Sequence, residues 1–156
     1  MARTSATVFT LYEAACSGFT VDDSLIIHCE FKQDAAYQAT IRLLDSPTPP
    51  DAIFAISDRL ALGAFVAIKD KGLRIPEDVA IVGFNDEPVG SLITPRLSSV
   101  TLPAFEMGRR ATRLFIEHIQ TDGTPEVETI IIKPQLMIRE SSLKNAFNLK
   151  KNLKST

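Results

Sequence analysis

Polar side chains follow two apolar runs of this sequence, and their types suit the binding of a hydroxyl-rich small molecule. One group is a Ser-Asp-Arg triplet and the other an Asn-Asp pair, with two phenylalanines close to strand ends. Hydroxyl, carboxylate, amide and guanidinium groups pair with ligand hydroxyls, while an aromatic face covers the C–H face of a sugar ring. The candidate ligand contacts are Phe31, Ser57, Asp58, Arg59, Phe84, Asn85 and Asp86.

Five of these candidates also have a structural explanation. Asp58 can cap the start of a helix, because its oxygens accept from free backbone N–H groups. Phe31 and Phe84 can pack in a core, as aromatic residues at strand ends commonly do. Asn85 and Asp86 can simply turn the chain. The sequence leaves both explanations open for these five residues.

Groups for catalysis or metal binding are not recognisable. His28 and Cys29 are neighbours in a predicted strand and so point to opposite faces, which prevents a base and nucleophile pair. The sequence has neither a glycine-rich dinucleotide motif nor a phosphate-binding loop ending in Gly-Lys-Ser/Thr. Asp58 and Asp86 lack a third ligand at a suitable spacing. We therefore expect a binding protein that is not an enzyme and that uses no cofactor or metal.

Alternating strand and helix patterns must position the candidate contacts. Short apolar runs at residues 25–31, 52–56 and 79–84 predict buried strands. The helical patterns between them predict crossovers, so the order indicates an α/β fold with a doubly wound parallel sheet. The carboxyl ends of neighbouring parallel strands meet at one edge, where ligands bind. We expect the candidate contacts to meet there.

Local signals bound the two predicted helices. Lys32, Gln33 and Asp34 offer a turn and a cap for the first, and the proline cluster at residues 47–50 ends it. Its predicted inner face carries Tyr37, Ile41 and Leu44. The second is expected to begin at the Ser57-Asp58 pair and to end at Gly72.

The rest of the chain predicts further elements. A short strand is expected at residues 98–102 and a helix at 105–119. A loop follows at 121–125, and two strand pieces at 127–133 and 135–139 are separated by Pro134. After residue 142 the chain becomes basic, and we expect a frayed tail.

Composition excludes several classes of protein. Among 156 residues, 17 are basic and 19 acidic, giving a net charge of −2. We therefore expect no general attraction of the surface to nucleic acid or to anionic membranes. Two cysteines, Cys16 and Cys29, cannot form a disulfide framework, and no apolar run is long enough to span a bilayer. No export signal is recognisable, so we expect a cytoplasmic protein.

Four segments, in order along the chain, resemble hallmarks of the LacI/GalR family of bacterial transcription regulators, which are related to periplasmic sugar-binding proteins. They are residues 50–64 (PDAIFAISDRLALGA), 72–86 (GLRIPEDVAIVGFND), 95–100 (PRLSSV) and 136–142 (LMIRESS). The resemblance covers residues 25–142 and not the first 24. It implies a module that closes on a small effector, often a sugar or nucleobase, behind a helix-turn-helix domain that binds operator DNA.

The resemblance also implies a division of the chain. Residues 25–103 would form the C-terminal effector-binding subdomain, and residues 104–133 a helix and strand that belong to the N-terminal subdomain. A closing strand at 134–142 and a basic tail at 143–156 would follow, and residues 1–24 diverge from the family. Phe31, Ser57, Arg59 and Asn85 fall where the family places ligand contacts. The family more often has Asn or Thr at position 57 and Asp at position 85.

A dimer is the expected assembly. Leu62, Phe65 and Ile93 fall where the family builds its dimer interface. The part of the chain that belongs to the other subdomain also carries apolar faces that need a partner, and such patches seldom stay exposed on a monomer. We expect a dimer or a domain-swapped assembly to bury Phe105, Met107, Leu114, Phe115 and Ile130 to Ile132.

Three functions remain open from the sequence. The favoured one is an effector-binding and dimerisation module of a LacI-type regulator that reaches operator DNA only through a helix-turn-helix domain not recognisable in this chain. An extracytoplasmic sugar receptor of the same fold is the second. A ligand-free interaction module is the third, because an arginine that the family offers ahead of the strand at 25–31 is not recognisable.

Overall fold

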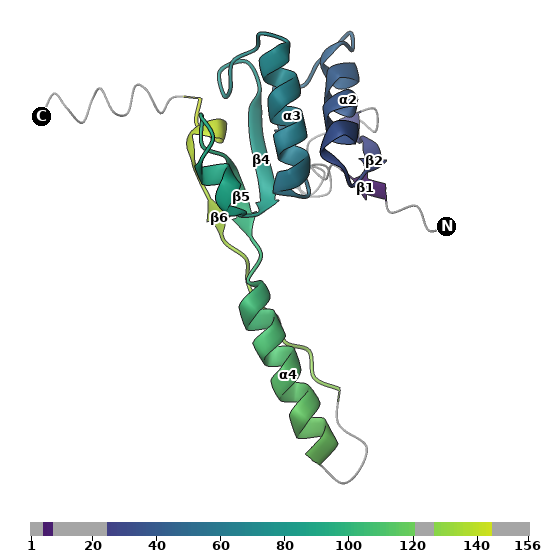
Figure 1. Ribbon diagram of the computed structural model, residues 1–156, viewed down its shortest axis with the longest axis vertical. Coiled ribbons are helices and arrows are strands. Elements are labelled where there is room, and N and C mark those ends of the chain that lie inside the picture. The colour runs from purple at the N-terminus through teal and green to yellow at the C-terminus, as the bar shows by residue number, and fades with distance from the viewer. Residues whose placement is uncertain (1–4, 8–24, 121–126, 145–156) are drawn as a thin grey trace, which may run out of the picture.

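The computed structural model describes residues 5–7, 25–120 and 127–144 of the chain. The predicted loop at 121–125, the tail beyond residue 144, Cys16 and most of the divergent segment 1–24 lie outside the described residues. Figure 1 shows two parts: a body in which helices pack on a sheet, and one helix that projects from it. The body contains the candidate contacts.

The main sheet of the body is mixed and mostly parallel. Its strands are β3 (Ala52–Phe54), β4 (Ala80–Asn85), β5 (Ser98–Thr101) and β6 (Leu136–Met137), which lie in that order across the sheet. The pairs β3–β4 and β4–β5 are parallel, whereas β6 runs antiparallel to β5. The predicted α/β fold is confirmed, and the parallel arrangement holds for β3 and β4, at whose ends the Ser-Asp-Arg and Asn-Asp groups lie.

The predicted buried strand at residues 25–31 is wrong in its extent and its place. The structure has a strand β2 (His28–Glu30) of three residues, which pairs antiparallel with β1 (Ser5–Thr7) in a separate sheet. His28 and Glu30 are exposed, and only Cys29 between them is partly buried. The apolar composition of the run indicated burial but did not specify which strand would pair with it.

Two helices pack against each other beside the main sheet. They are α2 (Gln33–Leu44) and α3 (Asp58–Asp70), and α3 lies on β4 (Figure 1). Ser57 is the N-cap of α3, and Gly72 follows its C-cap with φ of 72°, as the sequence signals predicted. The inner face of α2 is turned from the predicted one. Its buried residues are Ala36, Ala39 and Thr40, which suit a close approach of the two helices.

Small side chains let α2 and α3 approach closely at Gly63. A Cβ at this position would overlap the Gln33 carbonyl oxygen and would lie 3.0 Å from the Ala36 Cβ. Two polar contacts join α2 to the C-terminal end of α3. Tyr37 donates a hydrogen bond to Asp70 over 3.0 Å, and Lys71 pairs with Asp45. The close approach therefore fixes the middle of α3 against α2, and the two polar contacts fix its C-terminal end.

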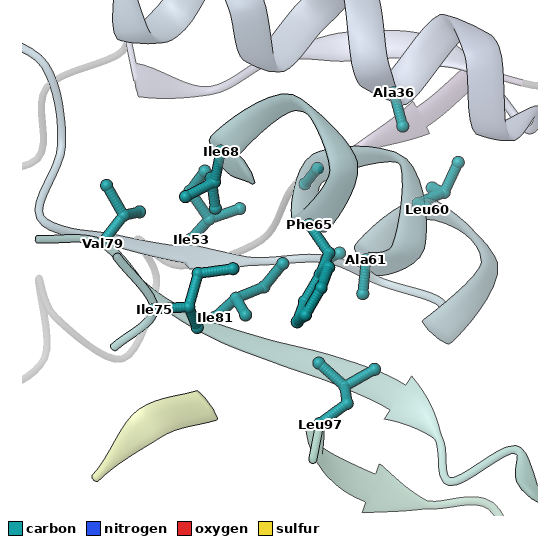
Figure 2. Close-up of a cluster of buried hydrophobic side chains, with 12 residues drawn as sticks. Ala36, Ile53, Leu60, Ala61, Phe65, Ile68, Ile75, Val79, Ile81 and Leu97 are labelled. Atoms are coloured by element: carbon teal, nitrogen blue, oxygen red, sulfur yellow. The ribbon is translucent and has the colours of Figure 1, made fainter. Parts of the chain in front are cut away.

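Apolar side chains of α3 fill the space above the sheet. Figure 2 shows Phe65 and Ile68 of α3 directed toward the strands, with Ile81 of β4 and Leu97 close by. Phe65, Ile68, Ile81 and Leu97 are all buried. Burying an aliphatic or aromatic side chain of this size contributes roughly 1.5–3 kcal/mol, so this layer anchors α3 on the sheet.

The last long helix, α4 (Ala104–Gln120), leaves the body instead of packing on it (Figure 1). None of its residues is buried. The predicted strand at residues 127–133 is wrong: no strand is assigned there, because no described strand lies beside it to pair with. Of the predicted strand at 135–139, only β6 forms. No helix in the described ranges has both the length and the apolar character that a membrane span requires.

The excursion that contains α4 begins and ends at one place on the body. The Thr101 N–H donates to the Gln135 carbonyl oxygen over 2.7 Å, and the Gln135 N–H donates to Thr101 Oγ1 over 2.9 Å. Beyond this neck, residues 136–137 pair with β5, and a short 3-10 helix η3 (Glu140–Ser142) packs on β4 and β5.

Candidate functional site

The register of β3 and β4 brings two candidate groups to the same sheet edge. Phe54 pairs with Val82 in parallel register. Ser57 follows Phe54 by three residues, and Asn85 follows Val82 by three. Parallel strands end on the same side, so the Ser-Asp-Arg and Asn-Asp groups lie at neighbouring strand ends, as predicted.

Ser57 fixes the start of α3 at this edge. Its side chain is almost fully buried, and its Oγ accepts a hydrogen bond from the Arg59 N–H over 3.2 Å. Arg59, two residues further along, is exposed, and no ion pair joins it to another described residue. The serine hydroxyl therefore caps the helix, and the helix start places the Arg59 side chain at the solvent-exposed side of the edge.

Asp58 lies behind the edge instead of facing solvent. It is 0% exposed, its Oδ1 accepts from the Ser99 hydroxyl over 2.6 Å, and its Oδ2 accepts from the Glu87 N–H over 2.6 Å. Burial raises the pKa of this carboxyl above its usual range, against the two hydrogen bonds, which lower it. In this geometry Asp58 ties α3, β5 and the loop after β4 together and offers no surface to a ligand.

The last residue of β4 and the loop after it have an unusual backbone. Asn85 has a φ of 101° and Asp86 a φ of 55°, which are left-handed values that non-glycine residues adopt at a cost. The Asp86 N–H donates to Ser99 Oγ over 3.0 Å. Just before the loop, a Cβ at Gly83 would overlap the Asp58 carboxylate. Glycine is therefore required at position 83 for the carboxylate to reach its partners.

Residues after β6 complete the support for this loop. Arg139 pairs with the Asp86 carboxylate over 2.7 Å and donates from Nη1 to the Leu97 carbonyl oxygen over 2.7 Å. Buried Ser141 donates to the Ile81 carbonyl oxygen over 2.6 Å and accepts from the Ser98 N–H over 2.8 Å. These contacts join the chain's last described segment to β4 and β5.

Sequence reasoning missed three of the residues that shape this edge: Ser99, Glu87 and Arg139. One signal was available for the first, because Ser98 and Ser99 are two adjacent hydroxyls in a predicted strand whose neighbours are apolar. Both serines are fully buried in the structure, so each must have a hydrogen-bond partner. No local signal pointed to Glu87, which acts through its backbone. Arg139 lies in the hallmark segment 136–142, but nothing in the sequence indicated that it contacts Asp86.

The two aromatic candidates are placed differently. Phe84 is in β4, is partly buried, and pairs in register with Val100. Phe31 follows β2 in the separate sheet and is 42% exposed. Sheet pairing therefore does not bring Phe31 to the edge that carries Asn85.

The three predicted interface residues differ in exposure. Phe65 is 8% exposed and packs in the core of this chain, which leaves it little surface to offer a partner. Leu62 and Ile93 are partly buried, and Ile93 packs against the same core. Their role in a dimer stays a prediction.

An apolar pocket lies between the helices and β3, and none of the candidate polar contacts lines it. Its wall combines Cys29 of β2 and Ile53 of β3 with residues of both helices, and burial raises the pKa of the Cys29 thiol. The wall consists of Ile27, Cys29, Ala36, Ala39, Thr40, Leu43, Ile53, Ala55, Leu60 and Ala64. With so few polar groups it does not suit a hydroxyl-rich ligand.

Comparison with known proteins identifies the family. Residues 3–142 match the periplasmic binding protein-like domain. The chain belongs to this family. Its relatives are LacI-family transcriptional regulators, as the sequence motifs indicated. The HTH-type transcriptional regulator CelR of Thermobifida fusca is 37% identical over 125 residues, which are 80% of this chain and 36% of CelR.

Solved structures of the family agree in fold. The transcriptional regulator CelR–cellobiose complex has a TM-score of 0.75 and 35% identity, over 83% of this chain and 39% of that one. A LacI family regulator from Arthrobacter sp. FB24 in complex with lactose has a TM-score of 0.67 and 32% identity, over 74% of this chain and 43% of that one. The chain spans about a third of the length of the curated relatives that it matches.

Proposed function

We propose that the chain is an effector-binding module of a LacI-type transcriptional regulator, that its effector is a sugar, and that it performs no catalysis. The observation that carries the proposal is the register that puts the Ser57–Arg59 and Asn85–Asp86 groups at one sheet edge. A guanidinium and an amide at that edge can pair with sugar hydroxyls, and Phe84 directly precedes Asn85 in β4. The family's cellobiose and lactose complexes support the ligand class.

The place of this module in regulation follows from the same proposal. A ligand that binds one arrangement of a two-state protein more tightly shifts the population toward it. In a LacI-type regulator that shift would alter the fit of DNA-binding domains to operator DNA. We expect the module to act in the cytoplasm. Since the described residues include no helix-turn-helix, we expect operator contact to come from a separate domain.

A thermal-shift panel tests whether the chain binds a sugar. Cellobiose, lactose and ribose are the probes, with adenine and guanine as representatives of the nucleobase class. A ligand at 100 times its dissociation constant adds about 2.7 kcal/mol to the free energy of unfolding, which raises Tm measurably. A rise for one sugar supports the proposal. Unchanged Tm across the panel contradicts it and favours a ligand-free interaction module.

Replacing Arg59 with alanine is expected to weaken binding of the selected sugar by roughly 10- to 100-fold. The reason is that a hydrogen bond to a charged group contributes about 1.5–3 kcal/mol, and Arg59 is exposed at the candidate edge. Arg42→Ala is the matched control, because Arg42 is an exposed arginine in the last turn of α2. Isothermal titration calorimetry compares the variants. Equal dissociation constants for both would remove Arg59 from the site.

The proposed module also self-associates through α4 and the segment that follows residue 126. What supports this is the apolar surface on the projecting helix, where Phe105 is 86% exposed and Phe115 is 65% exposed. Ile131 is 80% exposed on the returning segment. Surfaces of this kind mark association sites. A second copy of the chain offers the same apolar face and a closed two-fold arrangement.

Light scattering at micromolar concentration tests the assembly. We expect a dimer mass for the wild type and a monomer mass for Phe115→Glu, because a carboxylate in an apolar interface would be desolvated without a partner. Gln120→Glu adds the same charge at an exposed polar position of the same helix and is expected to remain a dimer. A monomeric wild type would contradict the proposal.

A further inference from the structure

The left-handed backbone at Asn85 and Asp86 needs a restraint, because two successive non-glycine residues rarely adopt positive φ values. Two buried side chains bind the backbone of the loop. Ser99 accepts from the Asp86 N–H over 3.0 Å, and Asp58 accepts from the Glu87 N–H over 2.6 Å. Both act on the backbone. Neither fixes the side-chain end of the loop.

The side-chain end is held by Arg139. Its Nη2 lies 2.7 Å from Asp86 Oδ1, and both side chains are only 20% exposed. That carboxylate oxygen is buried and makes no aligned hydrogen bond within the described residues, so the guanidinium charge is its compensation. An unpaired buried carboxylate is costly, which makes this contact an obligatory one for the loop.

Arg139 is itself held by β5 and by Leu97, the residue directly before β5. Its Nη1 donates to the Leu97 carbonyl oxygen over 2.7 Å, and its N–H donates to Ser98 Oγ over 2.7 Å. The fork of the guanidinium therefore bridges a backbone oxygen next to β5 and the carboxylate of the loop. Lysine has a single ammonium group and does not present this planar fork.

We propose that Arg139 is a positioning residue of the effector site: its bridge from Leu97 to Asp86 holds the Asn85–Asp86 backbone in the conformation that the site requires. The part that concerns affinity rests on the proposed function, whereas the part that concerns the loop does not. The bridge also makes loop geometry depend on the segment at residues 139–142, which is reached only after the α4 excursion.

Amide hydrogen exchange, followed by NMR on the whole 156-residue chain, tests the positioning role without any ligand. In Arg139→Met the Asp86 and Glu87 amides are expected to exchange about tenfold faster or more, with little change in the amides of α3. Arg96→Met is the matched control. It removes the ion pair with Glu140 of the adjoining 3-10 helix over 2.9 Å, and the two loop amides are expected to keep their rates.

Two further variants keep the test decisive if Arg139→Met does not fold. Asp86→Asn removes the charge at the other end of the pair and is expected to accelerate the Glu87 amide similarly. Arg139→Lys is expected to lie between the wild type and Arg139→Met, because it restores charge without the fork. Unchanged loop amides in the folded variants would overturn the proposal.

Sugar affinity gives the second readout. With the sugar that the panel selects, Arg139→Met is expected to raise the dissociation constant about fivefold or more, and Arg96→Met to leave it within about twofold. If Arg139 acts through Asp86, adding Arg139→Met to Asp86→Asn changes the dissociation constant no further, whereas independent effects would multiply and overturn the proposal. If the wild type binds no sugar while the loop amides respond, the proposed function fails and the positioning role stands.

Discussion

Replacing Gly63 with alanine is expected to lower the free energy of unfolding by about 3 kcal/mol or more, close to the upper end of what overpacking usually costs. A Cβ at this position would overlap the Gln33 carbonyl oxygen and crowd the Tyr37 nitrogen at 3.1 Å. Both are backbone atoms of α2, so no side chain can move aside. The helices must separate, and the apolar layer between them must loosen.

Urea denaturation followed by circular dichroism measures the change. Gly108→Ala is the matched control, since Gly108 is also in a helix and a Cβ there would meet nothing within 4 Å. Alanine is favoured over glycine in a helix by roughly 0.8–1 kcal/mol, so the control is expected to be neutral or stabilising. If both variants unfold at the same urea concentration, the close contact between α2 and α3 does not contribute as described.

Replacing Asp58 with alanine is expected to cost about 3 kcal/mol of unfolding free energy at neutral pH. The change removes the acceptor for the Ser99 hydroxyl and for the Glu87 N–H, and buried donors left without a partner are costly. Asp58→Asn keeps the size of the side chain and one accepting oxygen, so it is expected to cost about half as much. Thermal unfolding of the two variants beside the wild type measures both effects.

The contribution of Asp58 is expected to depend on pH in a direction opposite to that of most carboxylates. Burial raises its pKa in the folded chain, so the folded state holds the proton more tightly than the unfolded state does. The stability of the wild type relative to Asp58→Asn should therefore fall as the pH rises from the ordinary value of 3.8 through the raised pKa. A relative stability that rises over this window would contradict the assignment.

Asp78 provides the internal comparison for that measurement. Hydrogen bonds from the Arg74 guanidinium and backbone hold its pKa down to about 2. The stability that it contributes is present above the unfolded value of 3.8 and is lost as the pH falls toward 2. A carboxyl NMR titration should find Asp78 titrating below its ordinary pKa and Asp58 above it.

The elements that local chemistry specifies were predictable from the sequence. The apolar runs that became β3 and β4 are flanked by clear helix start and stop signals, including the Ser57 cap and Gly72. The edge shared by Ser57 and Asn85 followed from the rule that parallel strands end together. The predicted helix at 105–119 also matches α4 within a residue at each end.

The predictions that were wrong concern residues whose partners are distant in sequence. The apolar run at 25–31 became a short, mostly exposed strand because its pairing partner is β1. The run at 127–133 forms no strand because no described strand pairs with it. The site was incomplete for the same reason. Arg139 reaches Asp86 across 53 positions of sequence, and Glu87 contributes only its backbone N–H.

The neck between Thr101 and Gln135 has a kinetic consequence. To pair β6 with β5, the folding chain must close the loop formed by residues 102–134, and the entropy of closure grows with loop length. Joining the two strands by a tight turn would turn this distant pairing into a local hairpin and lower the contact order of the body. The excursion therefore behaves as a removable insertion, and the body without it should fold faster.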